Sequence, residues 1–174
     1  MTFPESNAAP HDNVDVFLAY ALKVEQEAGL RFGMLADSMG AAGNRDAEKI
    51  FRKMAHFSQM HYAEARARAR YHDLPGMTAQ DFQWPAFESP ETAAIWAADP
   101  LIAKEQALEI ALAAERAAHD FYADVLARTD DPEVKALATE FVLEEGDHVK
   151  WMLRWIAEDK ANAAHDWVDA LEAH

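Results

Sequence analysis

The residues of this chain best placed to do chemistry are Glu145 and His148, within residues 144–148. Because they are three apart, a helix would point both side chains from one face, roughly 60° from each other. A carboxylate and an imidazole at this spacing form the ligand pair that metal-binding helix bundles project into their cores. The pair alone is a weak signal, so the prediction of a metal site depends on further ligands elsewhere in the chain.

An internal repeat supplies those further ligands. The segment around Glu115 aligns with the segment around Glu25, and His148 aligns with His61 in the helix that follows. Two neighbouring metal ions need anionic oxygen ligands to offset their charge and imidazoles to complete the coordination shell. The predicted metal ligands are Glu25, His61, Glu115, Glu145 and His148.

A full set for two ions would hold four carboxylates and two imidazoles, so one carboxylate is missing from this list. The repeat aligns Glu145 with Ser58, and a neutral serine is a poor metal ligand. Two other residues offer alternatives for completing the site. Glu64 lies three residues after His61, and His119 lies four residues after Glu115.

Four long helices are predicted to position these residues, because apolar side chains recur at helical spacing. The predicted helices span 13–39, 44–71, 100–128 and 132–159. The connector at 72–99 is rich in proline and contains Trp84, Phe87 and Trp96, which we expect to cover the core. The tail at 160–174 is predicted to include a short amphipathic helix.

Short turns after the first and third helices, with a long connector between the second and third, predict two antiparallel hairpins joined by a crossover. This all-α arrangement is the ferritin-like form of the four-helix bundle. At 174 residues, the chain is predicted to form a single domain over residues 1–174.

Composition excludes several classes of function. A formal net charge of −15 argues against binding to nucleic acid or to an anionic membrane surface. No apolar run approaches the roughly 20 residues of a membrane span, and residues 1–10 lack the pattern of a signal peptide. The absence of cysteine excludes disulfides and thiolate metal sites. We therefore expect a cytoplasmic protein.

The second half of the chain resembles rubrerythrin, of the ferritin-like superfamily. The resemblance is strongest over residues 100–155 and continues in register, more weakly, over 14–70. The matching stretches include residues 107–109, 121–122, 129–135 and 144–149, together with Glu115. The resemblance implies a carboxylate-bridged pair of iron ions at the middle of the bundle, and a homodimer.

Carried over residue by residue, the resemblance assigns Glu25, His61, Glu115, Glu145 and His148 as iron ligands. The chain departs from the family at Ser58, where rubrerythrins have a glutamate, and at Ala118, where they often have an additional glutamate. It also lacks the cysteine-rich rubredoxin domain of full-length rubrerythrins. Electrons for any peroxidase reaction are therefore expected from a separate donor protein.

The function expected from these features is reduction of peroxide or oxidation of ferrous iron at a non-haem di-iron centre. One alternative is a binding or structural bundle whose site has lost one or both metal ions, for which Ser58 is the main argument. Another is an oxygen-activating hydroxylase, with an organic substrate held by the aromatic residues of the connector.

Overall fold

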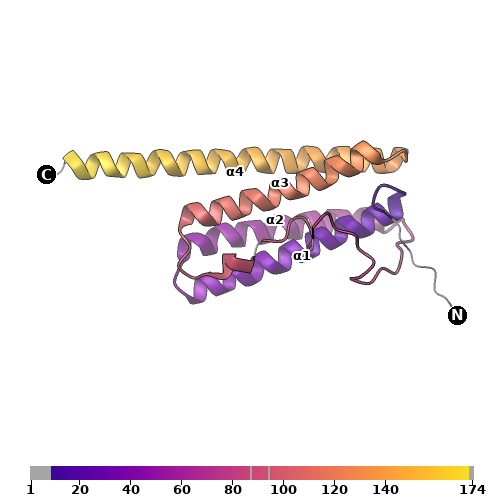
Figure 1. The fold of residues 1–174 in the computed structure, drawn as a ribbon, viewed down its shortest axis with the longest axis horizontal. Coiled ribbons are helices and arrows are strands. Elements are labelled where there is room, and N and C mark those ends of the chain that lie inside the picture. Colours follow the sequence, from indigo (N-terminus) through magenta and orange to yellow (C-terminus); the bar gives the residue numbers. More distant parts are fainter. Residues whose placement is uncertain (1–8, 87, 94, 173–174) are drawn as a thin grey trace.

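The chain forms four long helices in the computed structural model, which describes residues 9–86, 88–93 and 95–172. These helices are α1 (Val14–Ala41), α2 (Arg45–Ala69), α3 (Lys104–Arg128) and α4 (Pro132–Glu172), and a short 3₁₀ helix, η1 (Ile95–Ala98), precedes α3. α1 packs against α2 and α3 packs against α4, giving two hairpins that lie side by side (Figure 1). The described residues contain no strand, and the predicted all-α four-helix bundle is confirmed.

The turn between α1 and α2 also fixes the end of the crossover, which runs from residue 70 to residue 103. Gly43 has a positive φ of 81°, a conformation that favours glycine, and Asn44 follows it. The Asn44 side chain accepts a hydrogen bond from the backbone N–H of Ala47 and so caps α2. Its amide also donates to the carbonyl oxygens of Pro100 and Ile102, at 3.1 and 2.9 Å.

The predicted start of the third helix at residue 100 is wrong, because α3 begins at Lys104. The carboxylate of Asp99 accepts a hydrogen bond from the N–H of Leu101, but it closes only a local turn. The same Asp-Pro signal is correct at α4, where Asp131 accepts from the N–H of Glu133 at 2.8 Å. An Asp followed by Pro therefore favours a turn or a helix start, and the residues beyond decide between them.

The C-terminal tail is not a separate short helix, as had been predicted, but a continuation of α4 to Glu172. Residues 147–172 contain no glycine or proline that would end the helix. Figure 1 shows the end of α4 extending past the other three helices.

The buried core consists of two apolar clusters with a polar layer between them. The first cluster includes Ala28 and Phe32 of α1, and the second includes Phe17 and Val24 from earlier turns of the same helix. Glu25 is buried where the two clusters meet along α1. The apolar residues on both sides thus place this carboxylate at the middle of the bundle.

Aromatic residues attach the crossover to the second cluster. Trp84 packs edge-on against Tyr20 and Phe121, with ring centroids 5.1 and 5.9 Å apart. The Tyr20 hydroxyl accepts a hydrogen bond from the backbone N–H of Gln83 at 2.8 Å. Phe87 and the side chain of Trp96, which were also expected to cover the core, lie outside the described residues.

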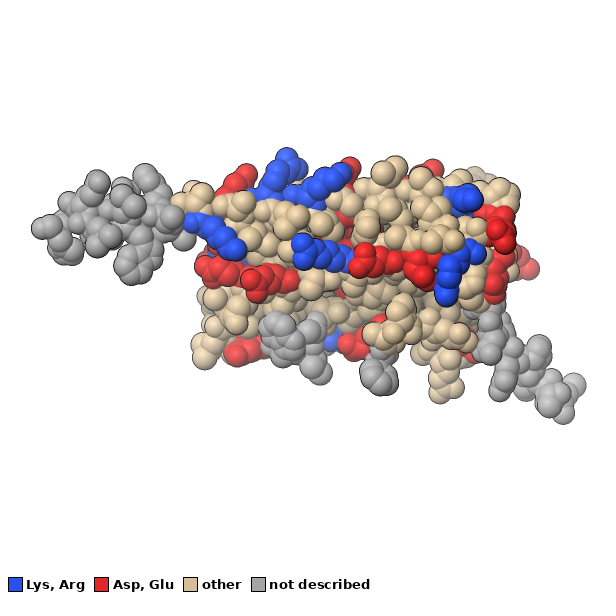
Figure 2. All heavy atoms as spheres, turned by 45° about the horizontal axis from the view of Figure 1, so that its top comes forward, with Lys and Arg blue, Asp and Glu red and all other residues tan. Residues whose placement is uncertain are grey.

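The surface carries charges of both signs. On the face shown in Figure 2, basic side chains are interspersed with acidic ones. No helix among the described residues is long and apolar enough to span a membrane.

Candidate metal centre

The five predicted metal ligands come together between the four helices. Glu25 lies on α1, His61 on α2, Glu115 on α3, and Glu145 and His148 on α4. The three carboxylates are between 1% and 4% exposed, so they lie in the polar layer of the core. The imidazoles are partly buried at its edge. Their role as ligands stays a prediction, but the structure brings all five side chains to one place.

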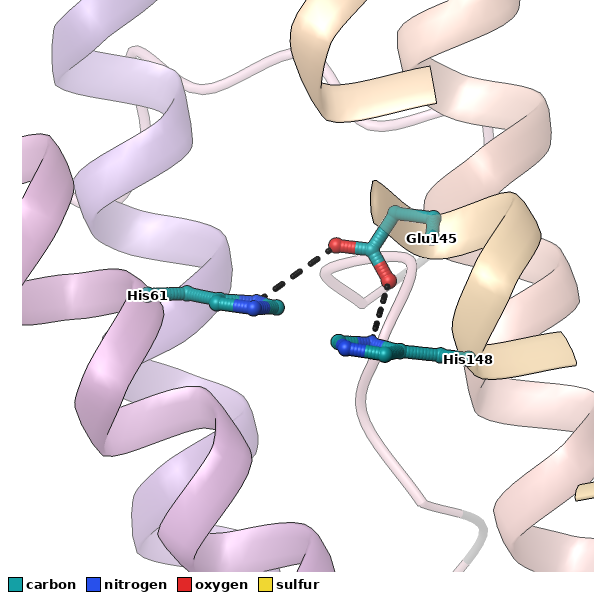
Figure 3. A group of neighbouring side chains, drawn as sticks. All are labelled: His61, Glu145 and His148. Carbon is teal, nitrogen blue, oxygen red and sulfur yellow. Dashed lines mark ion pairs between the residues drawn. The ribbon is translucent and has the colours of Figure 1, made fainter. Parts of the chain in front are cut away.

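Glu145 lies between the two imidazoles (Figure 3). One of its oxygens is 3.7 Å from Nδ1 of His61, and the other is 3.4 Å from Nδ1 of His148. His148 also contacts Glu115, at 3.1 Å. His61 lies 3.8 Å from Glu25. The two imidazole rings are nearly parallel, with centroids 4.8 Å apart. Each ring has its Nδ1 atom directed toward the carboxylates.

A fourth buried carboxylate joins this group, and the sequence reasoning missed it. Glu91 lies in the crossover, is 2% exposed, and accepts a hydrogen bond from the Ser58 hydroxyl at 3.1 Å. The carboxylate that helical spacing failed to supply on α2 therefore comes from an irregular segment. Periodicity cannot identify such a residue, and the available signal was an acidic residue beside small residues in a proline-rich connector.

The two residues suggested to complete the site do not belong to its buried group of carboxylates. Glu64 is exposed on α2, although it lines a small cavity together with Glu25, His61 and Glu145. His119 pairs with its neighbour Asp120 at 3.1 Å. The resulting buried set is four carboxylates and two imidazoles: Glu25, Glu91, Glu115, Glu145, His61 and His148.

Burial and mutual repulsion perturb the acidic groups. Burial raises the pKa of Glu25 and Glu91 well above the usual range, and the neighbouring carboxylates add to the effect. Burial likewise raises the pKa of Glu145, to about 7, against the opposing ion pair with His148. These carboxylates are therefore held in positions that disfavour their own charge.

The two imidazoles differ in their response to this environment. Burial lowers the pKa of His61. Burial also disfavours the charged form of His148, but its hydrogen bond to Glu115 and its ion pair with Glu145 outweigh this effect and raise its pKa to about 10. In the protein without metal, His148 is thus an imidazolium that partly offsets the carboxylates.

Several polar atoms in this layer have no hydrogen-bond partner among the described residues. They include Oε2 of Glu25, Oε2 of Glu91, Oε2 of Glu145 and the hydroxyl of Tyr122. Leaving buried carboxylate oxygens unpaired is costly. A cation bound among them would remove that cost, so the donor set fits metal ions.

The geometry offers two groups of donors that share one residue. Single ligand atoms of Glu25, Glu91 and Glu145 lie within 4.8 Å of one another, and so do those of His61, Glu145 and His148. Glu145 belongs to both groups, so its carboxylate could bind a cation held by either. Carboxylate oxygen combined with imidazole suits first-row ions such as iron, manganese or zinc.

Comparisons with known proteins agree with this arrangement. The family model of rubrerythrin matches residues 16–156. A crystal structure of an uncharacterized conserved protein from Magnetospirillum magnetotacticum is similar over 84% of this chain and 95% of its own, with 33% identity and a TM-score of 0.65. No curated protein matches the chain.

Proposed function

Because the chain belongs to the rubrerythrin family, we propose that it is a di-iron protein that reduces peroxide or oxidises ferrous iron. The observation that carries this proposal is the buried layer of carboxylates and imidazoles, in which three carboxylate oxygens lack a hydrogen-bond partner among the described residues. We assign Glu25, Glu115 and Glu145 as carboxylate ligands, and His61 and His148 as imidazole ligands.

The chemistry that a bound iron pair supplies is two electrons, one per ion, which with two protons convert a peroxide into two water molecules. The residues of the chain would bind the positively charged ions and keep water away from them. Glu145 presents one oxygen toward each imidazole. His148 must give up its extra proton before its Nδ1 lone pair is available to a metal ion. The apolar clusters on both sides shield the layer from solvent.

The source of electrons follows from composition. The 174 residues contain no cysteine, so they cannot bind iron through thiolates as a rubredoxin domain does. For peroxide reduction, we therefore propose a separate electron-donor protein. The homodimer implied by the resemblance belongs to the same proposal, and sedimentation analysis would test it.

Anaerobic titration of the metal-stripped protein with ferrous iron tests the proposal. We expect about two tight iron sites per chain, which together form one di-iron centre. Addition of peroxide should then oxidise the bound iron rapidly. Glu145→Gln should weaken binding by about 100-fold or more, because loss of residues that merely support a ligand already costs 10–100-fold.

Glu144→Gln is the matched control for this titration. Glu144 precedes Glu145 but points from a different, partly exposed face of α4. The control should stay within about threefold of wild type, as surface substitutions usually do. Equal losses in the two variants would mean that the wrong face of α4 has been assigned. A wild-type protein that binds no iron would favour the alternative of a structural bundle.

A second candidate function rests on one observation, a cavity between the crossover and α3. It measures about 1170 Å³ and is lined by Trp84, Ile110 and Phe121, among other residues. A cavity of this size and lining could take an organic molecule. For an oxygen-activating hydroxylase, dioxygen uptake by the iron-loaded protein should depend on an added apolar compound, whereas a peroxidase needs none.

A further inference from the structure

The crossover presents Glu91 to the polar layer through a tight turn. The N–H of Thr92 donates to the carbonyl oxygen of Ser89 at 3.0 Å, which closes a β-turn with Pro90 and Glu91 at its two central positions. Proline at the second position of a turn fixes its φ and so favours this geometry. Glu91 is therefore held at the corner of the turn, which gives a loop residue a defined direction.

The side chain of Glu91 points into the bundle. Ser58 donates a hydrogen bond to Oε1, while Oε2 is buried and has no hydrogen-bond partner among the described residues. A ligand oxygen of Glu91 lies within 4.8 Å of ligand oxygens of Glu25 and Glu145. A buried carboxylate that has one oxygen unpaired and two other carboxylates beside it is unfavourable unless a cation completes the arrangement.

Ser58 explains why there is room for a carboxylate from outside the helices. It precedes His61 by three residues, as Glu145 precedes His148. A glutamate at position 58 would repeat the Glu-x-x-His pair of α4. The smaller serine leaves the space to the Glu91 carboxylate and hydrogen-bonds to it.

Arg31 of α1 holds the crossover on both sides of Glu91. Its guanidinium donates to the carbonyl oxygen of Ala93 and to the Glu88 carboxylate, each at 3.0 Å. A planar guanidinium that binds two points along one segment restricts its position more than a single contact would. The segment that carries Glu91 is thus fastened to the same helix as Glu25.

We propose that Glu91 is a ligand of the metal centre, supplied by the crossover in place of a carboxylate from α2. This inference rests on the proposed metal centre and adds a residue and a mechanical consequence to it. A metal ion bound to Glu91 joins the crossover to the helices, so metal loading should fix residues 88–93 against the bundle.

The same segment forms one wall of the large cavity. Ser89, Pro90, Thr92 and Ala93 line that cavity, whereas Glu91 between them points the other way. Occupancy of the metal site should therefore hold this wall in place. A molecule entering the cavity would meet a different surface in the metal-free protein than in the loaded one.

The first experiment compares Glu91→Gln with wild type in two measurements, anaerobic ferrous titration and hydrogen exchange of residues 83–93. In wild type, iron should slow exchange in this segment by about tenfold or more. In Glu91→Gln, the weaker of the two iron sites should lose at least about tenfold in affinity, and iron should no longer slow exchange there. Circular dichroism verifies that the variant is folded.

Glu88→Gln is the matched control, since Glu88 is an exposed carboxylate on the same segment. It should keep two iron sites of wild-type affinity and the slowing of exchange by iron. The double variant Ser58→Glu with Glu91→Gln returns the carboxylate to α2. It should recover the second iron site without recovering the slowing of exchange, which separates a ligand role from a purely structural one.

The outcomes separate the two proposals. Wild-type affinity for both ions in Glu91→Gln would overturn the role of Glu91 and leave the five-residue centre standing. If the wild-type protein itself binds no iron, both proposals fail together. Slowed exchange that persists in Glu91→Gln would also overturn the link between metal and crossover.

Discussion

Glu145 is the residue shared by the two groups of potential metal ligands in the polar layer. It faces His61 with one oxygen and His148 with the other, while being only 2% exposed. Burial raises its pKa to about 7, and it raises those of Glu25 and Glu91 as well. These three carboxylates are therefore unfavourable in their charged form unless a cation is bound.

At this scale we predict that the metal-free protein loses stability as pH rises from about pH 5 to about pH 8. A raised pKa means that the folded state keeps protons that the unfolded state releases, so stability falls between the usual value of 4.5 and the raised value near 7 for Glu145. His148 acts in the same direction, since its stabilising contribution is lost as pH rises from 6.5 toward 10. The lowered pKa of His61 opposes this trend but involves one group.

Thermal unfolding across this pH range measures the effect. Glu145→Gln should flatten the dependence and raise the Tm of the metal-free protein at about pH 8, while Glu158→Gln, at an exposed position of α4, should change neither. A Tm that is constant with pH in the metal-free wild type would contradict the prediction.

At the scale of elements, the crossover is a structural part of the site rather than a passive link. Tyr20 holds it at Gln83, and Arg31 holds it at Glu88 and Ala93. These three attachments are made by α1, and Ser58 of α2 adds a hydrogen bond to Glu91 itself. The position of Glu91 in the polar layer therefore depends on the first hairpin.

We predict that Arg31→Ala loosens this attachment without unfolding the bundle. Hydrogen exchange of residues 88–93 should become up to about 30-fold faster in the metal-free protein, because two hydrogen bonds of about 1 kcal/mol each are lost. Iron should still slow exchange in the segment, through Glu91. Helical content should stay unchanged, and a loss of helix by circular dichroism would show that Arg31 supports the whole fold instead.

The sequence predicted the elements better than it predicted the site. Helical spacing of apolar residues located four helices. The internal repeat aligned Glu25 with Glu115 and His61 with His148. Glu91 could not be found in this way, because side chains in an irregular segment have no periodic direction. The continuation of α4 to Glu172, by contrast, could have been predicted, since no glycine or proline in the tail stops the helix.

At the scale of the whole molecule, the proposed metal site lies between two hairpins, which an ion pair between Arg68 and Glu140 also links, at 2.7 Å. The proposed ligands come from all four helices, and binding to all of them stabilises only the assembled bundle. A metal in 100-fold excess over its Kd should add about 2.7 kcal/mol, or roughly 5–10 °C in Tm for a chain of this size.

Calorimetry with and without metal tests this prediction. Chelation should return the Tm to the metal-free value, and Glu91→Gln should show a smaller increase than wild type. An unchanged Tm on addition of saturating ferrous iron or zinc would mean that no ion bridges the hairpins.

The division of the ligands between two hairpins also bears on how the chain reaches its native state. Each hairpin is made of helices adjacent in sequence, so it can form early, whereas the polar layer exists only after the hairpins dock. During docking, the carboxylates approach one another before any ion can be held. A metal ion therefore has few ligands available in the transition state for folding. Bound metal should slow unfolding, and so prolong the lifetime of the folded protein, while the rate of folding stays nearly unchanged.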